Sequence, residues 1–165
     1  MKSNWQDMAT RLRREISEYG QLLHLYEEQQ HLILRNSPRG VLEAGRAIEA
    51  QVRILDRERQ LREDSVGLFA AANGQPAGST LRSLLPLVEE DARPLFDALI
   101  LEINLLIHRV RRDAQRNHRL LRCMVDCHQE ILQRLRPDGF TKTYARNGRV
   151  SVAAARPALA SQADN

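Results

Sequence analysis

The longest unbroken pattern in this sequence is helical, and it constrains the fold more than any other feature. Between Leu99 and Ile131, candidate inward-facing residues recur in steps of four and three. They are Leu99, Ile103, Leu106, Val110, Asp113, Asn117, Leu120, Met124, Cys127 and Ile131. This spacing is typical of an amphipathic or coiled-coil helix. It predicts a helix over about residues 92–136, which Asp91 caps at its start and Pro137 ends.

Two earlier stretches have the same helical period. The first is predicted over residues 5–34, and Pro38 disfavours its continuation through "RNSPRG". The second is predicted over residues 41–69, and opposite charges alternate along its outer face. The connection between the two is short, so we expect them to be antiparallel neighbours.

A Gly/Pro-rich break, "AANGQPAGST", separates these two helices from the last one. A short helix over residues 80–88 is expected after it, disturbed near Pro86. Only 4% of the residues are aromatic, so the core must consist mainly of aliphatic side chains. The predicted fold is therefore all-α: an antiparallel, coiled-coil-like bundle of three long helices plus one short helix, with no strand signal.

The 165 residues suit one helical domain, residues 1–136, followed by a flexible tail over 137–165. The tail has two small apolar groups, Phe140 with Tyr144 and Val150 with Val152, among Gly, Pro, Ser and Ala. It cannot bury enough apolar surface to fold alone. Such a segment is either a solvated terminus or one that becomes ordered on a partner, where an exposed Tyr offers a large contact area.

Positive charge is concentrated late in the chain. Residues 108–136 contain eight basic and three acidic side chains, which gives +5, whereas the whole chain has a net charge of +4. In the same region the helical pattern becomes polar at Asp113 and Asn117. Polar positions there can fix the register of packing, form part of a partner surface, or accompany phosphate binding. No aromatic side chain that could stack on bases interrupts the basic segment, which disfavours nucleic acid.

The sequence has none of the motifs that carry common catalytic or cofactor chemistry. It has no Gly-rich phosphate loop, no nucleophile elbow and no pair of carboxylates in an apolar context. The five histidines lack the spacing of zinc ligands on a helix. We interpret Cys123 and Cys127 as small buried apolar side chains. We therefore expect no enzymatic activity, no cofactor and no metal.

The hydropathy pattern points to the cytoplasm. No stretch approaches the roughly 18 to 20 consecutive apolar residues that a membrane span needs. The first residues, "MKSNWQDMATRLRRE", lack the apolar middle part of a signal peptide.

Taken in order, these features resemble the FlgN family of flagellar export chaperones. A Trp near the start opens a helix that ends in "LLHLYEEQQHLIL", and "EAQVRILDRERQL" follows in the second helix. After the Gly/Pro break come "LRSLLP", a long helix with "NHRLL", and finally "TYARNG". The resemblance extends over about residues 5–150.

The resemblance implies a cytosolic chaperone that binds the helical terminal segments of hook-associated proteins, which join hook to filament. It would keep them unassembled and deliver them to the flagellar export gate and ATPase complex, with only indirect membrane contact and weak homodimerisation. The family's C-terminal region is tied to substrate binding and docking. The corresponding protein-binding residues here are Asn117, Leu121, Met124, Ile131, Leu132, Leu135, Phe140, Tyr144 and Gly148.

Two other classes of function remain open from the residues alone. One is a basic helical protein that binds nucleic acid through residues 108–136. The other is a structural coiled-coil adaptor that associates through the long helix. Phosphate binding would weaken steeply with salt, whereas apolar capture of a helix would change little. A structural rod would be an obligate oligomer.

Overall fold

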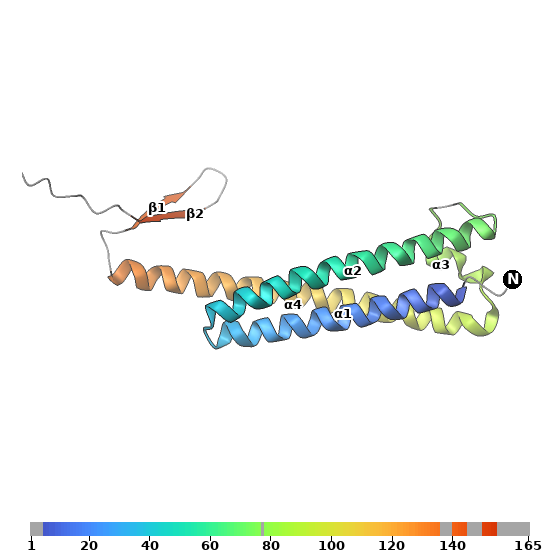
Figure 1. Cartoon of the computed structure of the whole chain (residues 1–165), viewed down its shortest axis with the longest axis horizontal. Coiled ribbons are helices and arrows are strands. Elements are labelled where there is room, and N and C mark those ends of the chain that lie inside the picture. Colours follow the sequence, from blue (N-terminus) through green and yellow to red (C-terminus); the bar gives the residue numbers. More distant parts are fainter. Residues whose placement is uncertain (1–4, 77, 136–139, 145–149, 155–165) are drawn as a thin grey trace, which may run out of the picture. The chain divides into compact units, whose positions relative to one another are not determined.

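A computed structural model describes residues 5–76, 78–135, 140–144 and 150–154 of the chain (Figure 1). It separates into two compact units, Met1–Leu120 and Leu121–Asn165. The expectation of a mainly helical protein is confirmed for these residues. The helices are α1 (Trp5–Leu34), α2 (Pro38–Ala72), α3 (Leu81–Leu84) and α4 (Arg93–Leu135), with 3₁₀ turns η1 (Leu85–Leu87) and η2 (Glu90–Ala92).

Proline and glycine explain most of the helix boundaries. Helix α2 begins at Pro38, three residues before the expected start, because proline fits the first helical turn, where its missing N–H is not needed. Gly74, with φ of 67°, follows the end of α2. The short helix expected over residues 80–88 is only α3, capped by the Thr80 side chain, which accepts from the Ser83 amide at 3.2 Å. Pro86 lies in η1, which continues the chain after α3.

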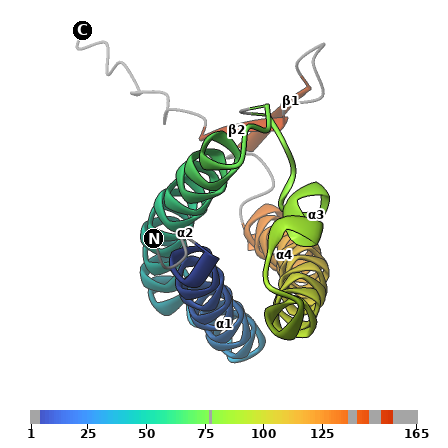
Figure 2. The same cartoon turned by 90° about the vertical axis from the view of Figure 1, so that its right-hand side faces the viewer.

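Helices α1 and α2 lie side by side and run in opposite directions (Figures 1 and 2). Three long-range polar contacts fix their register. Gln51 Nε2 donates to the Glu18 carboxylate at 2.6 Å, Arg62 Nε to Glu15 at 2.6 Å, and Ser65 Oγ to Asp7 at 2.6 Å. Partners of rising number on α2 meet falling numbers on α1, as antiparallel packing requires.

The first part of α4 packs in the same direction as α1. Near the start of both helices, the Trp5 and Phe96 rings meet edge to face, with centroids 6.2 Å apart. Near the end of α1, the Asn117 side-chain amide donates to the Tyr26 carbonyl at 2.7 Å. Helix α2 is therefore antiparallel to both of its long neighbours.

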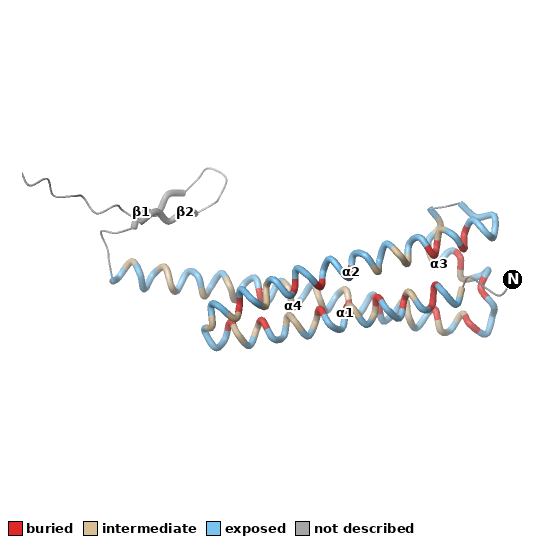
Figure 3. The backbone as a smooth tube through the Cα atoms, in the orientation of Figure 1, coloured by how far each residue is buried: buried red, intermediate tan, exposed pale blue. Residues whose placement is uncertain are grey.

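The core of the first unit draws on all four helices and is mainly aliphatic, with Tyr19, Phe69 and Phe96 as its buried aromatic side chains. Figure 3 shows its buried residues along the inner sides of the helices. The largest fully buried apolar side chains are Phe96, Met8, Leu12, Leu22 and Leu84. Burial of such side chains removes each from water at a gain of roughly 1.5–3 kcal/mol.

The expectation that the chain has no strand was wrong. Strands β1 (Phe140–Tyr144) and β2 (Val150–Ala154) pair antiparallel, with Phe140 opposite Ala154 and Tyr144 opposite Val150. Both strands contain β-branched residues at alternate positions, Thr141 and Thr143 in one, Val150 and Val152 in the other. Local pairing satisfies backbone groups without needing a large apolar core.

Candidate protein-binding surface

An apolar stripe runs along α4 within the second unit. We call the set Leu121, Met124, Val125, His128, Ile131, Leu132 and Leu135 the α4 stripe. Their spacing of three and four residues places them on one face, since each residue turns the helix by about 100°. Five members were predicted from the sequence: Leu121, Met124, Ile131, Leu132 and Leu135.

The α4 stripe is open to solvent in the described structure. No residue from Leu121 to Leu135 is buried (Figure 3). Leu135 is 73% exposed, Ile131 53%, Leu132 49% and Val125 47%. Adjacent exposed aliphatic side chains on one face form the kind of patch that marks a protein-interaction site.

Val125 and His128 belong to the same face and were not among the residues predicted from the sequence. The signal was present in the spacing of Leu121, Val125, His128, Leu132 and Leu135, which are four and three residues apart. His128 lies at the centre of the stripe, where it adds a polar ring to an otherwise apolar surface.

The interpretation of the two cysteines as buried was wrong, because both thiols are exposed. No residue of α4 from Leu121 to Leu135 is buried, so a position of the helical pattern in this segment is not covered whichever way it faces. The neighbouring Cys123 thiol is the main cause that raises the pKa of Cys127, followed by desolvation. A raised pKa leaves less of the reactive thiolate at neutral pH.

Asn117 lies in the core of the first unit, not on the α4 stripe. It is 2% exposed. Besides the Tyr26 carbonyl, its side-chain amide donates to Gln29 Oε1 at 3.1 Å, and Gln29 is itself buried. A buried amide with two partners on another helix fixes the register between the two.

Phe140 and Tyr144, the aromatic candidates in the tail, occupy the two ends of strand β1. Gly148, the third candidate there, lies outside the described residues. The structure thus brings five of the candidates onto one face of α4, places two in a strand, and places Asn117 in the core.

The described residues contain neither a metal-binding cluster nor a helix able to span a membrane. No group of three or more His, Cys, Asp or Glu side chains in these residues could hold a metal ion. None of the described helices combines the length and apolar character required to cross a bilayer.

The comparison with protein families gives one informative match. Residues 1–151 match the family model described as FlgN protein. Comparison with curated proteins and with solved structures gives no match. The matched range includes α1 to α4 and strand β1, so it covers the core and the α4 stripe.

Proposed function

Because the chain belongs to the FlgN family of flagellar export chaperones, we propose that its substrates are hook-associated proteins. The chaperone binds their helical terminal segments in the cytoplasm, prevents premature assembly and delivers them to the export gate and ATPase complex. The α4 stripe is the observation that carries this proposal.

The physical task of such a chaperone is to cover apolar surface on an unassembled chain. Segments that pair as helices in a finished filament have an apolar face with no partner before assembly. The α4 stripe offers matching residues at the same helical spacing, with Ile131, Leu132 and Leu135 as the largest exposed contacts. Two such faces can pack as a helix pair and remove both from water.

The hairpin of β1 and β2 is the second element of the proposed binding region. We assign Phe140, Tyr144 and Gly148 to contacts with the substrate or with the export gate. Aromatic side chains supply much of the energy of protein interfaces because they bury a large area with few rotatable bonds.

The test is binding of a purified hook-associated protein from the same organism to the full chain. In the double variant Ile131→Asp/Leu135→Asp, two charges interrupt the α4 stripe, and affinity is expected to fall at least tenfold. The matched control is Cys123→Asp/Gln133→Asp, which adds the same charge to other faces of the same helix segment. Calorimetry of both variants against the parent measures the difference.

Equal loss in both variants, or none in either, would remove the stripe from the proposed function. For the tail, Tyr144→Ala and a chain lacking residues 137–165 are compared with the parent in substrate capture and in export. If both behave as the parent does, the tail has no part in recognition.

Salt dependence separates capture of a helix from binding to phosphates. Affinity for the substrate that changes little between low and moderate salt favours capture of a helix. Sedimentation of the free chain measures the expected weak homodimer.

A further inference from the structure

The first unit contains a groove that the proposed function does not use. It encloses about 490 Å³ between α1, α2, α4 and the start of α3. One wall is aliphatic: Ile100, Ile103, Ile107 and Val110 follow one another along α4. Ile103 is already buried in the core, whereas the other three side chains are half-buried and keep part of their surface open. At about 1.5 Å per residue, this wall extends roughly 15 Å, or about three helical turns.

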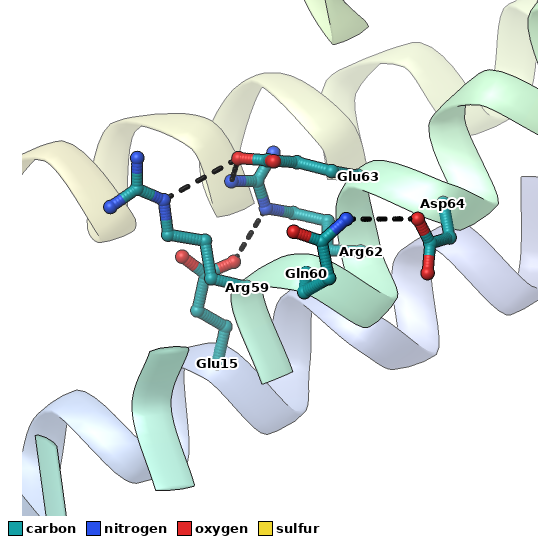
Figure 4. Close-up of polar contacts among 6 residues, drawn as sticks. All are labelled: Glu15, Arg59, Gln60, Arg62, Glu63 and Asp64. Carbon is teal, nitrogen blue, oxygen red and sulfur yellow. Dashed lines mark hydrogen bonds and ion pairs between the residues drawn. The ribbon is translucent and has the colours of Figure 1, made fainter. Parts of the chain in front are cut away.

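The floor of the groove contains a buried ion pair. Glu15 of α1 is 1% exposed, and its carboxylate accepts from Arg62 Nε at 2.6 Å (Figure 4). Arg59, which also lines the groove, lies 3.4 Å from the Glu63 carboxylate. The charges of these two arginines are therefore largely matched by carboxylates of the protein itself.

The rim of the groove has unmatched positive charge. Arg82 at the α3 end and Arg111 on α4 both line it, and both are exposed. Neither forms an ion pair with any residue in the described ranges. A ligand that enters the groove would meet an aliphatic wall between two free guanidinium groups, which bind carboxylates well.

The groove has short helical cover at one end. Helix α3 has only four residues, and Thr80, Leu81 and Arg82 line that end of the groove. All other residues that line the groove belong to α1, α2 and α4. A packed bundle buries an apolar wall of this length against another helix.

We propose that this groove binds an acidic amphipathic helix of a partner protein, about three turns long, which completes a four-helix bundle with α1, α2 and α4. The apolar face of the bound helix packs on the isoleucine wall. Its Glu or Asp side chains pair with Arg82 and Arg111. This site is separate from the α4 stripe and does not depend on it.

The probe is a synthetic peptide of about 14 residues, roughly 21 Å as a helix, with leucines three and four apart and glutamates on its flanks. A matched peptide has lysine in place of each glutamate. Binding to the full chain is followed by NMR of labelled isoleucine methyl groups. The acidic peptide is expected to shift Ile100, Ile103 and Ile107 and to leave Ile131 unchanged, and the lysine peptide to bind at least tenfold more weakly.

The variant Arg82→Glu/Arg111→Glu reverses the charge at the rim and changes no core residue. It should lower the affinity for the acidic peptide about tenfold or more. Arg46→Glu/Arg53→Glu makes the same charge change at exposed positions of α2 that do not line the groove, and should change affinity less than twofold. If charge reversal unfolds the protein, the neutral variant Arg82→Gln/Arg111→Gln replaces it, and a smaller loss of affinity for the acidic peptide is expected.

Three results would overturn the proposal. They are no binding of the acidic peptide, equal binding of the lysine peptide, and methyl shifts confined to Ile131. The last result would assign the peptide to the α4 stripe, so failure here is distinguishable from failure of the proposed function.

Discussion

Glu15 is a charged residue whose side chain is buried in the core of the first unit. Its carboxylate is almost completely buried and pairs with Arg62, which is itself 21% exposed. Removing the cation alone leaves a buried charge without compensation, which commonly costs about 3 kcal/mol or more, whereas replacing both partners by apolar residues is often neutral. We therefore expect Arg62→Met to be strongly destabilising and Glu15→Leu/Arg62→Met to recover most of the loss.

Urea denaturation of the two single variants and the double variant gives the coupling between the residues. The Glu63 carboxylate, 3.6 Å from Arg62, is a second partner, so Glu63→Gln serves as the exposed control and should change stability by less than about 0.5 kcal/mol. Additive losses in the double variant would mean that the buried pair is not coupled.

Two tyrosines make stability depend on alkaline pH. Burial is the main cause that raises the pKa of Tyr19 above its ordinary value of 10.0, and the Glu15 carboxylate adds to it. Burial also raises the pKa of Tyr26. In the window between pH 10 and the raised values, the unfolded chain loses these protons first, so the free energy of unfolding falls as pH rises.

Replacing both rings by phenylalanine, Tyr19→Phe/Tyr26→Phe, should flatten this decline between pH 9 and 11. Lysine residues contribute little to the pH dependence of stability in this range, because the chain has only Lys2 and Lys142. Thermal melts of parent and variant across this pH range make the comparison. An equally steep decline in the variant would assign the pH dependence to other groups.

At the scale of the elements, glycine positions in the helices differ in the space around them. An added Cβ at Gly20, in α1, would meet no atom within 4 Å, whereas at Gly40, in the first turn of α2, it would lie 2.8 Å from Leu32 Cδ2. Gly20→Ala should therefore raise the free energy of unfolding by about 0.5–1 kcal/mol.

Gly40→Ala gains the same preference for helix but must displace the Leu32 side chain, so we expect no net stabilisation. Gly67→Ala, also without a neighbouring atom within 4 Å, is the second open site and should behave like Gly20→Ala. The urea denaturation midpoints of the three variants, each compared with that of the parent, measure these differences in stability. A gain at Gly40 equal to that at Gly20 would show that the turn between α1 and α2 adapts freely.

The sequence was most informative where breaks are strong and elements are long. Pro38, Gly74 and the apolar periods located the three long helices, because proline and glycine act locally. The short helix was overextended, since Pro86 is compatible with a 3₁₀ turn as well as with the first turn of a helix. The strands were missed, although Asn147–Gly148 between two runs with β-branched residues is a hairpin signal in the sequence.

The binding surfaces were predictable to different degrees. The α4 stripe depends on one helix, so spacing alone identified most of it. The core position of Asn117 depends on Tyr26 and Gln29, which are about ninety residues earlier in the chain. The groove between Glu15, Arg82 and Arg111 requires residues of four helices to meet, and a one-dimensional pattern contains no such information.

For the whole molecule, burial and proposed binding belong to different parts of the chain. Within residues 5–76 and 78–135, the last buried apolar side chain is Leu106 and the last buried side chain of any kind is Asn117. A chain ending at residue 124 keeps about two helical turns beyond Asn117 and loses most of the α4 stripe. Residues 125–135 include no buried side chain, so the free energy of unfolding of the shortened chain should stay within about 1 kcal/mol of the parent value.

The same truncation should abolish capture of a hook-associated protein, because Val125, Ile131, Leu132 and Leu135 are gone. Urea denaturation followed by circular dichroism measures the free energy of unfolding of the truncated chain. Calorimetry with the hook-associated protein measures its affinity for the substrate. The acidic peptide serves as an internal control, since the truncated chain keeps the whole groove and should bind it as the parent does. A truncated chain that unfolds far more easily would mean that residues 125–165 stabilise the first unit, and the division between folding and recognition would then be wrong.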